Sequence, residues 1–160
     1  MRIGFGYDVH QFEKDRPLIL GGTSIPYTLG LKGHSDADVL IHALMDSMLG
    51  ALALGDIGSH FPDTDNQYKG IASIILLDKV CKLIEDKGYE MGNCDITVVA
   101  QAPKLAAYIQ QMQKTLAQHL RTSPDNVSIK ATTEEGLGFT GRKEGISAYA
   151  VCLLIRSSNK

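Results

Sequence analysis

The last apolar stretch of this chain, residues 146–155, constrains the fold more than any other feature. It reads ISAYAVCLLI, so its odd and even positions are both largely apolar. Successive side chains of a strand point to opposite faces of the sheet, and a strand buried on both faces has this continuous apolar character. We therefore expect a strand inside a sheet that is covered on both faces.

Helical and strand-like patterns alternate along the rest of the chain. Apolar residues at helical spacing predict helices over residues 35–52, 71–87 and 105–120. Strand patterns cover residues 2–10, 96–100 and 127–131, and a hairpin over residues 17–26 turns at Gly21-Gly22. Ser35, with Asp38 three residues later, predicts the N-cap of the first helix. Residues 55–65 read as an irregular loop.

Helices placed between strands favour an α/β (α+β) fold with a single mixed β-sheet and helices packed on one face. We expect a ferredoxin-like arrangement formed by one domain, residues 1–160. The opposite face of such a sheet is left without helices. Because residues 146–155 are too apolar to face water, we infer that other subunits cover this face.

Composition excludes several classes of function. A net charge of −2 without a Lys/Arg cluster argues against nucleic-acid binding. No apolar run approaches the roughly 20 residues needed to cross a bilayer, so we expect no membrane partner. Cys81, Cys94 and Cys152 are odd in number and form no CxxC pair, which indicates reduced thiols. With no apparent signal peptide, these features predict a cytoplasmic protein.

Three of the five histidines lie in the first 42 residues, close to several acids. Asp8 and His10 are two residues apart in a predicted strand, so their side chains point to the same face. With His42 they form the ligand set of a catalytic zinc site, which keeps a fourth position open. Asp38 or Asp46, one helical turn away, would hold the second nitrogen of His42. The alternative is a solvated helix face with an incidental histidine.

Three other segments carry polar side chains in patterns that suit a phosphorylated substrate. His34-Ser35-Asp36 stands at a predicted helix start, where backbone N–H groups attract phosphate. The alternative role of Ser35 is that of a helix cap, and the two roles are compatible. The loop segments 56–58 and 61–65 offer carboxylates to sugar hydroxyls or to a cation such as Mg²⁺. Residues 130–142 combine paired threonines, glutamates and three glycines, which suits a phosphate and a divalent cation but does not match a P-loop.

Several blocks of this sequence occur together, and in the same order, in one enzyme family. They are Arg2-Ile3-Gly4, Gly6, Asp8-Val9-His10, His34-Ser35-Asp36, Asp56-Ile57-Gly58, Phe61-Pro62-Asp63-Thr64-Asp65, Ala100-Gln101-Ala102-Pro103-Lys104, Lys130-Ala131-Thr132-Thr133 and Gly138-Phe139-Thr140-Gly141-Arg142. The blocks are long and extend over essentially the whole chain. The sequence therefore resembles the 2-C-methyl-D-erythritol 2,4-cyclodiphosphate synthase family, which belongs to the non-mevalonate isoprenoid pathway.

The resemblance implies conversion of 4-diphosphocytidyl-2-C-methyl-D-erythritol 2-phosphate to the cyclic diphosphate and CMP, in a homotrimer with active sites between subunits. Asp8, His10 and His42 would bind Zn²⁺, and Glu135 would help to hold Mg²⁺ or Mn²⁺ on the substrate diphosphate. His34 and Thr133 would stabilise the transition state. The implied substrate-binding residues are Ser35, Asp36, Asp56, Ile57, Gly58, Phe61, Pro62, Asp63, Thr64, Asp65, Ala100, Gln101, Ala102, Pro103, Lys104, Leu105, Ala106, Thr132, Phe139 and Arg142.

Within that set, residues 56–58 and 61–65 would hold the methylerythritol phosphate, and residues 100–106 with Thr132 would line the cytidine pocket of the neighbouring subunit. Phe139 and Arg142 would line the interface and a central cavity that holds an isoprenoid-like ligand. Tyr7, Ala37 and Glu134 depart from the residues common in the family, and which of Glu134 and Glu135 faces the cation stays open. Two rival functions are a zinc-dependent phosphohydrolase and a non-enzymatic metal- or lipid-binding trimer.

Overall fold

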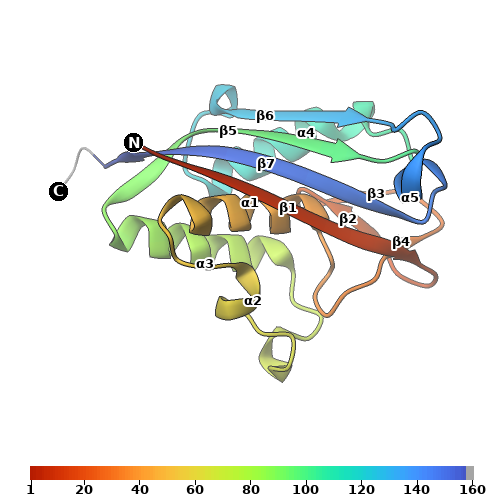
Figure 1. The fold of residues 1–160 in the computed structure, drawn as a ribbon, viewed down its shortest axis with the longest axis horizontal. Coiled ribbons are helices and arrows are strands. Elements are labelled where there is room, and N and C mark those ends of the chain that lie inside the picture. The colour runs from red at the N-terminus through yellow and green to blue at the C-terminus, as the bar shows by residue number, and fades with distance from the viewer. Residues whose placement is uncertain (158–160) are drawn as a thin grey trace.

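The computed structural model describes residues 1–157 and contains a five-stranded mixed sheet (Figure 1). Its strands lie in the order β4 (Gly30–Leu31), β1 (Arg2–Glu13), β7 (Gly145–Arg156), β5 (Tyr89–Val99) and β6 (Val127–Thr132). The pair β5–β6 is parallel and the other pairs are antiparallel. The predicted hairpin is confirmed, because β2 (Leu18–Leu20) and β3 (Thr23–Ile25) pair around Gly21 and Gly22.

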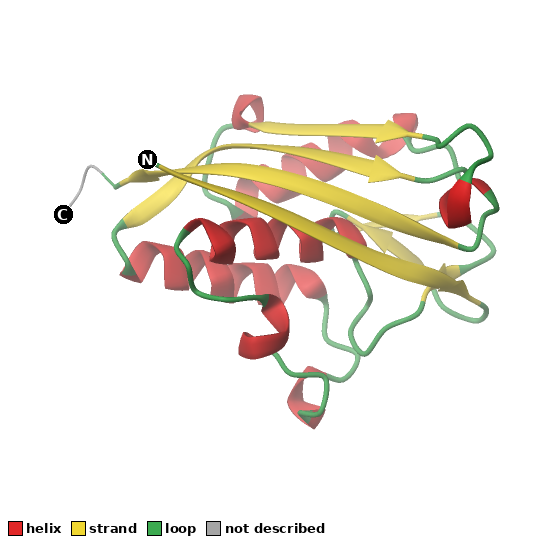
Figure 2. Cartoon of the chain, viewed as in Figure 1, coloured by secondary structure: helices red, strands yellow, loops and turns green. Residues whose placement is uncertain are grey.

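Three longer helices pack on one face of this sheet (Figure 2). They are α1 (Val39–Ala51), α3 (Ser73–Asp86) and α4 (Ile109–His119). The shorter helical segments are α2 (Ile57–His60), α5 (Gly138–Gly141), η1 (Asn66–Tyr68), η2 (Ala106–Tyr108) and η3 (Pro124–Asn126). The expected mixed sheet with helices on one face is therefore confirmed. The long strands and helices follow one another as β1, α1, α3, β5, α4, β6 and β7. This order differs from the β-α-β-β-α-β of a ferredoxin-like unit, so that finer expectation is not confirmed.

The central strand β7 is buried on one face only within this chain. Its residues that face α1, such as Ala148 and Leu154, are fully buried. On the opposite face Tyr149 and Val151 are 40% and 44% exposed, and Phe5 of the neighbouring strand β1 is 63% exposed. The sheet thus presents an apolar face that no helix of the described chain covers, as the sequence predicted.

The first helix begins later than its sequence pattern suggested. Its N-cap is Asp38, whose side chain accepts a hydrogen bond from the backbone N–H of Ile41. The prediction that Ser35 caps this helix was wrong, because Ser35 lies in the loop before it and its hydroxyl accepts from the N–H of Ala37. Within residues 1–157 no helix combines the length and the apolar character needed to span a membrane.

Candidate metal centre and adjoining cavities

Asp8, His10 and His42 lie together, as the sequence predicted. Strand β1 contributes the first two side chains on one face, and α1 contributes the third. His10 Nε2 lies 3.0 Å from Asp8 Oδ2 and 3.1 Å from His42 Nδ1, and His42 Nδ1 lies 2.9 Å from Asp8 Oδ2. The three atoms form a small triangle, which identifies them as one group that can hold a metal ion.

The donor set and its spacing fit a zinc ion. Zinc bonds to histidine nitrogen and carboxylate oxygen are about 2.0–2.2 Å, so neighbouring ligands of a tetrahedral ion are about 3.3 Å apart. The observed separations of 2.9–3.1 Å are close to that value. Three protein ligands leave one coordination position for another molecule.

The protein orients His10 through its other ring nitrogen. His10 Nδ1 lies 2.6 Å from the backbone carbonyl of Lys32. A carbonyl only accepts hydrogen bonds, so Nδ1 carries a proton, and Nε2 is the nitrogen that faces the group and can bind a metal. Burial would raise the pKa of Asp8, but hydrogen bonds and charge interactions with His10 and His42 outweigh it and hold the pKa below its ordinary value. The carboxylate is therefore ionised and suited to a cation.

The predicted outer partners of His42 are wrong. Asp38 accepts hydrogen bonds from the N–H groups of the β2–β3 turn and of α1, and Asp46 accepts from the N–H of Ile57. The second ring nitrogen of His42 instead lies 2.9 Å from the hydroxyl of Ser73, at the start of α3. The sequence analysis missed Ser73, and its only local signal is a serine at the beginning of a predicted helix.

A cavity of about 550 Å³ opens beside the metal group. Its predicted lining residues are Asp8, His10, His34, Ser35, His42, Ile57, Gly58, Phe61, Pro62, Asp63 and Thr64, and its unpredicted ones are Gly33, Tyr68 and Leu76. Three predicted acids do not line it. Asp36 accepts from Ser73, Asp56 caps α2, and Asp65 caps η1. Residues far apart in the sequence thus gather around one opening.

A second cavity, of about 590 Å³, lies between the ends of β5 and β6 and the start of α4. It is lined by Ala100, Gln101, Pro103, Lys104, Leu105, Ala106, Ile109, Ala131, Thr132 and Thr133. Most of these residues were predicted to form one pocket. Among the residues that the structure describes, none lines both this cavity and the one beside the metal group.

The two adjacent glutamates in the loop that follows β6 accept hydrogen bonds from different threonines. Thr133 donates a hydrogen bond of 3.0 Å to Glu135, whereas Thr140 donates to Glu134. Glu134 thus contacts α5, whereas Glu135 lies beside Thr133. Arg142 pairs with Glu144 at 2.6 Å and is exposed. Phe139 and Arg142 do not line either of the two cavities within this chain.

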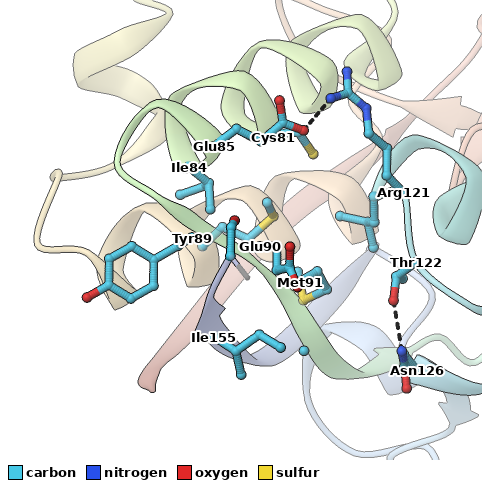
Figure 3. Close-up of a pocket in the computed structure, with 14 residues that line it drawn as sticks. Cys81, Ile84, Glu85, Tyr89, Glu90, Met91, Arg121, Thr122, Asn126 and Ile155 are labelled. Carbon is cyan, nitrogen blue, oxygen red and sulfur yellow. Dashed lines mark hydrogen bonds and ion pairs between the residues drawn. The ribbon is translucent and has the colours of Figure 1, made fainter. Parts of the chain in front are cut away.

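A third cavity, of about 460 Å³, lies where β5 begins and β7 ends (Figure 3). At its rim Arg121 is paired with Glu85, and Asn126 donates to Thr122. Burial raises the pKa of the Cys81 thiol to about 12, so this sulfur stays protonated and unreactive. None of the predicted site residues lines this cavity, and we assign it no part in the reaction.

The fold and the three-residue group together define an α+β protein that has a potential metal site with an open cavity beside it. Residues 1–155 match the model of the YgbB family, and the chain belongs to this family. The 2-C-methyl-D-erythritol 2,4-cyclodiphosphate synthase of Clostridioides difficile is 61% identical over 158 residues, which cover 99% of this chain and 98% of that protein. The expected family and the expected class of enzyme are confirmed.

Two solved structures are similar over nearly the whole chain. The bifunctional IspDF from Campylobacter jejuni has a TM-score of 0.93 and 46% identity, and the match covers 97% of this chain and 42% of that one. The IspF–CDP complex of Plasmodium falciparum has a TM-score of 0.85 and 37% identity, with 98% of this chain and 97% of that one covered. The order and packing of the elements are therefore those of this family.

Proposed function

We propose that the protein converts 4-diphosphocytidyl-2-C-methyl-D-erythritol 2-phosphate into 2-C-methyl-D-erythritol 2,4-cyclodiphosphate and CMP. The observation that carries this proposal is the convergence of Asp8, His10 and His42 at the edge of a cavity lined by the predicted substrate-binding loops. The solved relative that binds CDP supports a cytidine-containing ligand. The second cavity, which is lined by residues 100–101, 103–106, 109 and 131–133, is the proposed cytidine pocket.

The reaction is an intramolecular phosphoryl transfer. An oxygen of the 2-phosphate bonds to the β-phosphorus, the bond from that phosphorus to the oxygen shared with the α-phosphate breaks, and CMP leaves. Such a reaction asks the protein for positioning and for neutralisation of charge rather than for a covalent nucleophile. Holding the two phosphates in line lowers the barrier by about 7–11 kcal/mol when the geometry is well matched.

Each proposed site residue has a part in this scheme. Asp8, His10 and His42 would hold Zn²⁺, whose positive charge would offset that of the diphosphate. Glu135 would hold Mg²⁺ or Mn²⁺, since these ions bind proteins through one or two carboxylates together with substrate phosphates. His34 and Thr133 would donate hydrogen bonds to the phosphate oxygens as charge develops. The polar loops 56–58 and 61–65 would bind the methylerythritol phosphate.

We propose that the active unit is a homotrimer in which each chain acts as one domain, residues 1–160, in the cytoplasm. The exposed apolar face around Phe5, Tyr149 and Val151 supports this assembly, because water-exposed apolar patches of this kind mark protein interfaces. Since the two cavities of one chain share no lining residue, the cytidine pocket of one subunit would meet the metal cavity of the next. Phe139 and Arg142 would then line a central cavity for an isoprenoid-like ligand.

The decisive test is to incubate the purified, zinc-loaded protein with the diphosphocytidyl substrate and analyse the products by mass spectrometry and ³¹P NMR. We expect equal amounts of the cyclic diphosphate and CMP. Inorganic phosphate or a linear product would instead support a zinc-dependent phosphohydrolase. Zinc binding without any turnover would support the non-enzymatic alternative. A sample from which the metal has been removed by a chelator provides the control for metal-dependent turnover.

A further inference from the structure

We propose that Ser73, held by Asp36, is a positioning residue for the metal centre. It fixes which ring nitrogen of His42 carries the proton, so that Nδ1 offers its lone pair to the metal. This inference rests on the proposed function only in taking Asp8, His10 and His42 as metal ligands. It concerns side chains that do not themselves belong to the ligand group.

The contacts of Ser73 single it out. It is the first residue of α3 and is fully buried. Its hydroxyl oxygen lies 2.9 Å from His42 Nε2 and 2.5 Å from Asp36 Oδ1. Ser35 is the other neighbour of the same nitrogen, and its hydroxyl lies farther away, at 3.3 Å. Ser73 therefore makes the shorter of the two contacts that orient the ring.

The direction of these hydrogen bonds follows from counting protons. A hydroxyl has one proton to donate, and a carboxylate only accepts. The proton of Ser73 therefore goes to Asp36, and its oxygen accepts a hydrogen bond from His42. His42 Nε2 must then carry a proton, so Nδ1 is the nitrogen that is free to give up its own proton and bind a metal. That atom is the one that lies 2.9 Å from Asp8 and 3.1 Å from His10.

Asp36 is itself held in place by backbone groups. Its Oδ2 accepts from the N–H of Ser73 at 3.0 Å, and its Oδ1 accepts from the N–H of Asp38 at 3.2 Å. The residue before α3, Ala72, makes no side-chain cap. Asp36, from a distant part of the chain, therefore caps the N-terminus of α3, and a negative charge is favourable at a helix N-terminus. One carboxylate thus joins the start of α3 to the ring of His42.

With a metal bound, the two ligand histidines would consequently be held in opposite tautomers. His10 donates from Nδ1 to the carbonyl of Lys32 and presents Nε2. His42 donates from Nε2 to Ser73 and presents Nδ1. Partners of this kind hold metal-binding histidines in a fixed orientation, and their loss typically weakens metal binding 10- to 100-fold. Ser73 and Asp36 would supply that support for His42.

The first test compares zinc affinity in Ser73→Ala and in a matched control, Ser47→Ala. Ser47 is also a fully buried serine, and its hydroxyl donates to the Leu44 carbonyl within α1. Zn²⁺ is titrated into the metal-stripped full-length chain against a competing chelator. We expect Ser73→Ala to raise the dissociation constant about 10- to 100-fold, and Ser47→Ala to leave it within about threefold of the wild type.

The second test reads the tautomers directly by long-range ¹H–¹⁵N NMR of the metal-stripped, ¹⁵N-labelled protein at neutral pH. We expect His42 to carry a proton at Nε2 in the wild type. In Ser73→Ala the proton at Nε2 should become less populated relative to the one at Nδ1, because the acceptor at Nε2 is lost while Asp8 still faces Nδ1. Asp36→Asn retains the size of the side chain but only one oxygen that accepts. It should shift the His42 tautomers in the same direction and weaken zinc binding.

The outcomes separate this inference from the function on which it rests. If the wild type binds no zinc, the proposed metal centre is wrong. If the wild type binds zinc while Ser73→Ala and Asp36→Asn bind it equally well and retain the tautomer of His42, the positioning role is overturned. Should Ser73→Ala fail to fold, Asp36→Asn alone decides the question through the same two measurements.

Discussion

Gly6 of β1 lies directly against the backbone of Ala43 in α1. A Cβ atom added at Gly6 would lie 2.0 Å from the Ala43 carbonyl oxygen, so the two backbones approach more closely than any side chain would permit. Asp8 follows two residues later on β1, and His42 directly precedes Ala43 on α1. The close approach of the strand and the helix therefore brings Asp8 Oδ2 within 2.9 Å of His42 Nδ1.

We predict that Gly6→Ala destabilises the protein and weakens its zinc site. The added methyl group meets a backbone carbonyl, which cannot rotate away as a flexible side chain can. Overpacking of this kind costs about 1–3 kcal/mol and sometimes more, and we expect about 3 kcal/mol of unfolding free energy in urea denaturation. Zinc titration of the folded fraction should show lower affinity, because β1 must move away from α1.

Gly50→Ala provides the control for this substitution. Gly50 also lies in α1, but its added Cβ would meet only the Phe5 carbonyl at 3.9 Å, an ordinary contact. Alanine is favoured over glycine within a helix by about 0.5–1 kcal/mol. We expect this variant to be as stable as the wild type or more so, and equal destabilisation of the two variants would contradict the packing argument.

His42→Ala should abolish zinc binding and nearly all turnover while the fold is kept. The substitution removes one of three metal ligands. Zinc affinity should therefore fall by more than the roughly 100-fold that is the upper range for losing a residue that only supports a ligand. Metal analysis of the purified protein and an assay of CMP release measure the two effects. His119→Ala is a suitable control, since that histidine pairs with Asp78 on the surface, away from the metal group. Undiminished turnover in a zinc-free His42→Ala protein would refute the metal centre.

The stability of the metal-free protein should depend on the protonation of Asp38. Burial, and to a smaller degree the charge of Asp36, raises the pKa of Asp38 from 3.8 to about 6, although three backbone N–H groups oppose the shift. The folded state then binds this proton more tightly than the unfolded state does. The resulting stabilisation is fully present below about pH 4 and is lost as the pH rises through about 6.

Comparison with Asp38→Asn isolates this effect, because the amide does not titrate. The difference in unfolding free energy, wild type minus variant, should fall by about 2 kcal/mol between pH 4 and pH 7. Urea denaturation in the presence of a chelator provides the measurement and removes any contribution from metal release. A difference that is independent of pH over this range would show that the pKa of Asp38 is not raised.

Substitution of the apolar sheet face should affect assembly more than folding. Phe5→Glu places a charge on a residue that is 63% exposed in one chain, so the isolated subunit should tolerate it. Burial of that charge between subunits would be costly, so light scattering should show a trimer for the wild type, as proposed, and monomers for the variant. Ile75→Glu, at an exposed position of α3 on the helical side, should leave the mass unchanged. An intact trimer of Phe5→Glu would place the interface elsewhere.

Much of this architecture could be predicted from local patterns, because they depend on neighbours in the sequence. The period of two in β1 placed Asp8 and His10 on one face, and helical spacing located α1, α3 and α4 approximately. The start of α1 was predicted at residue 35 but lies at residue 39. The prediction was wrong because Ser35 and Asp38 both have side chains that can cap a helix. Only the hydrogen bond from Ile41 to Asp38 distinguishes them.

The amino-acid sequence by itself determined the chemical nature of the site: one carboxylate, two imidazoles and loops rich in polar groups. It also determined that both faces of the central strand are apolar, because successive side chains of a strand alternate between the two faces of the sheet. Only the tertiary structure decided the partner of His42. Ser73 is 31 residues away, and it reaches the imidazole because α3 packs beside α1. Contacts of that kind depend on how whole elements pack, which no local pattern of residues specifies.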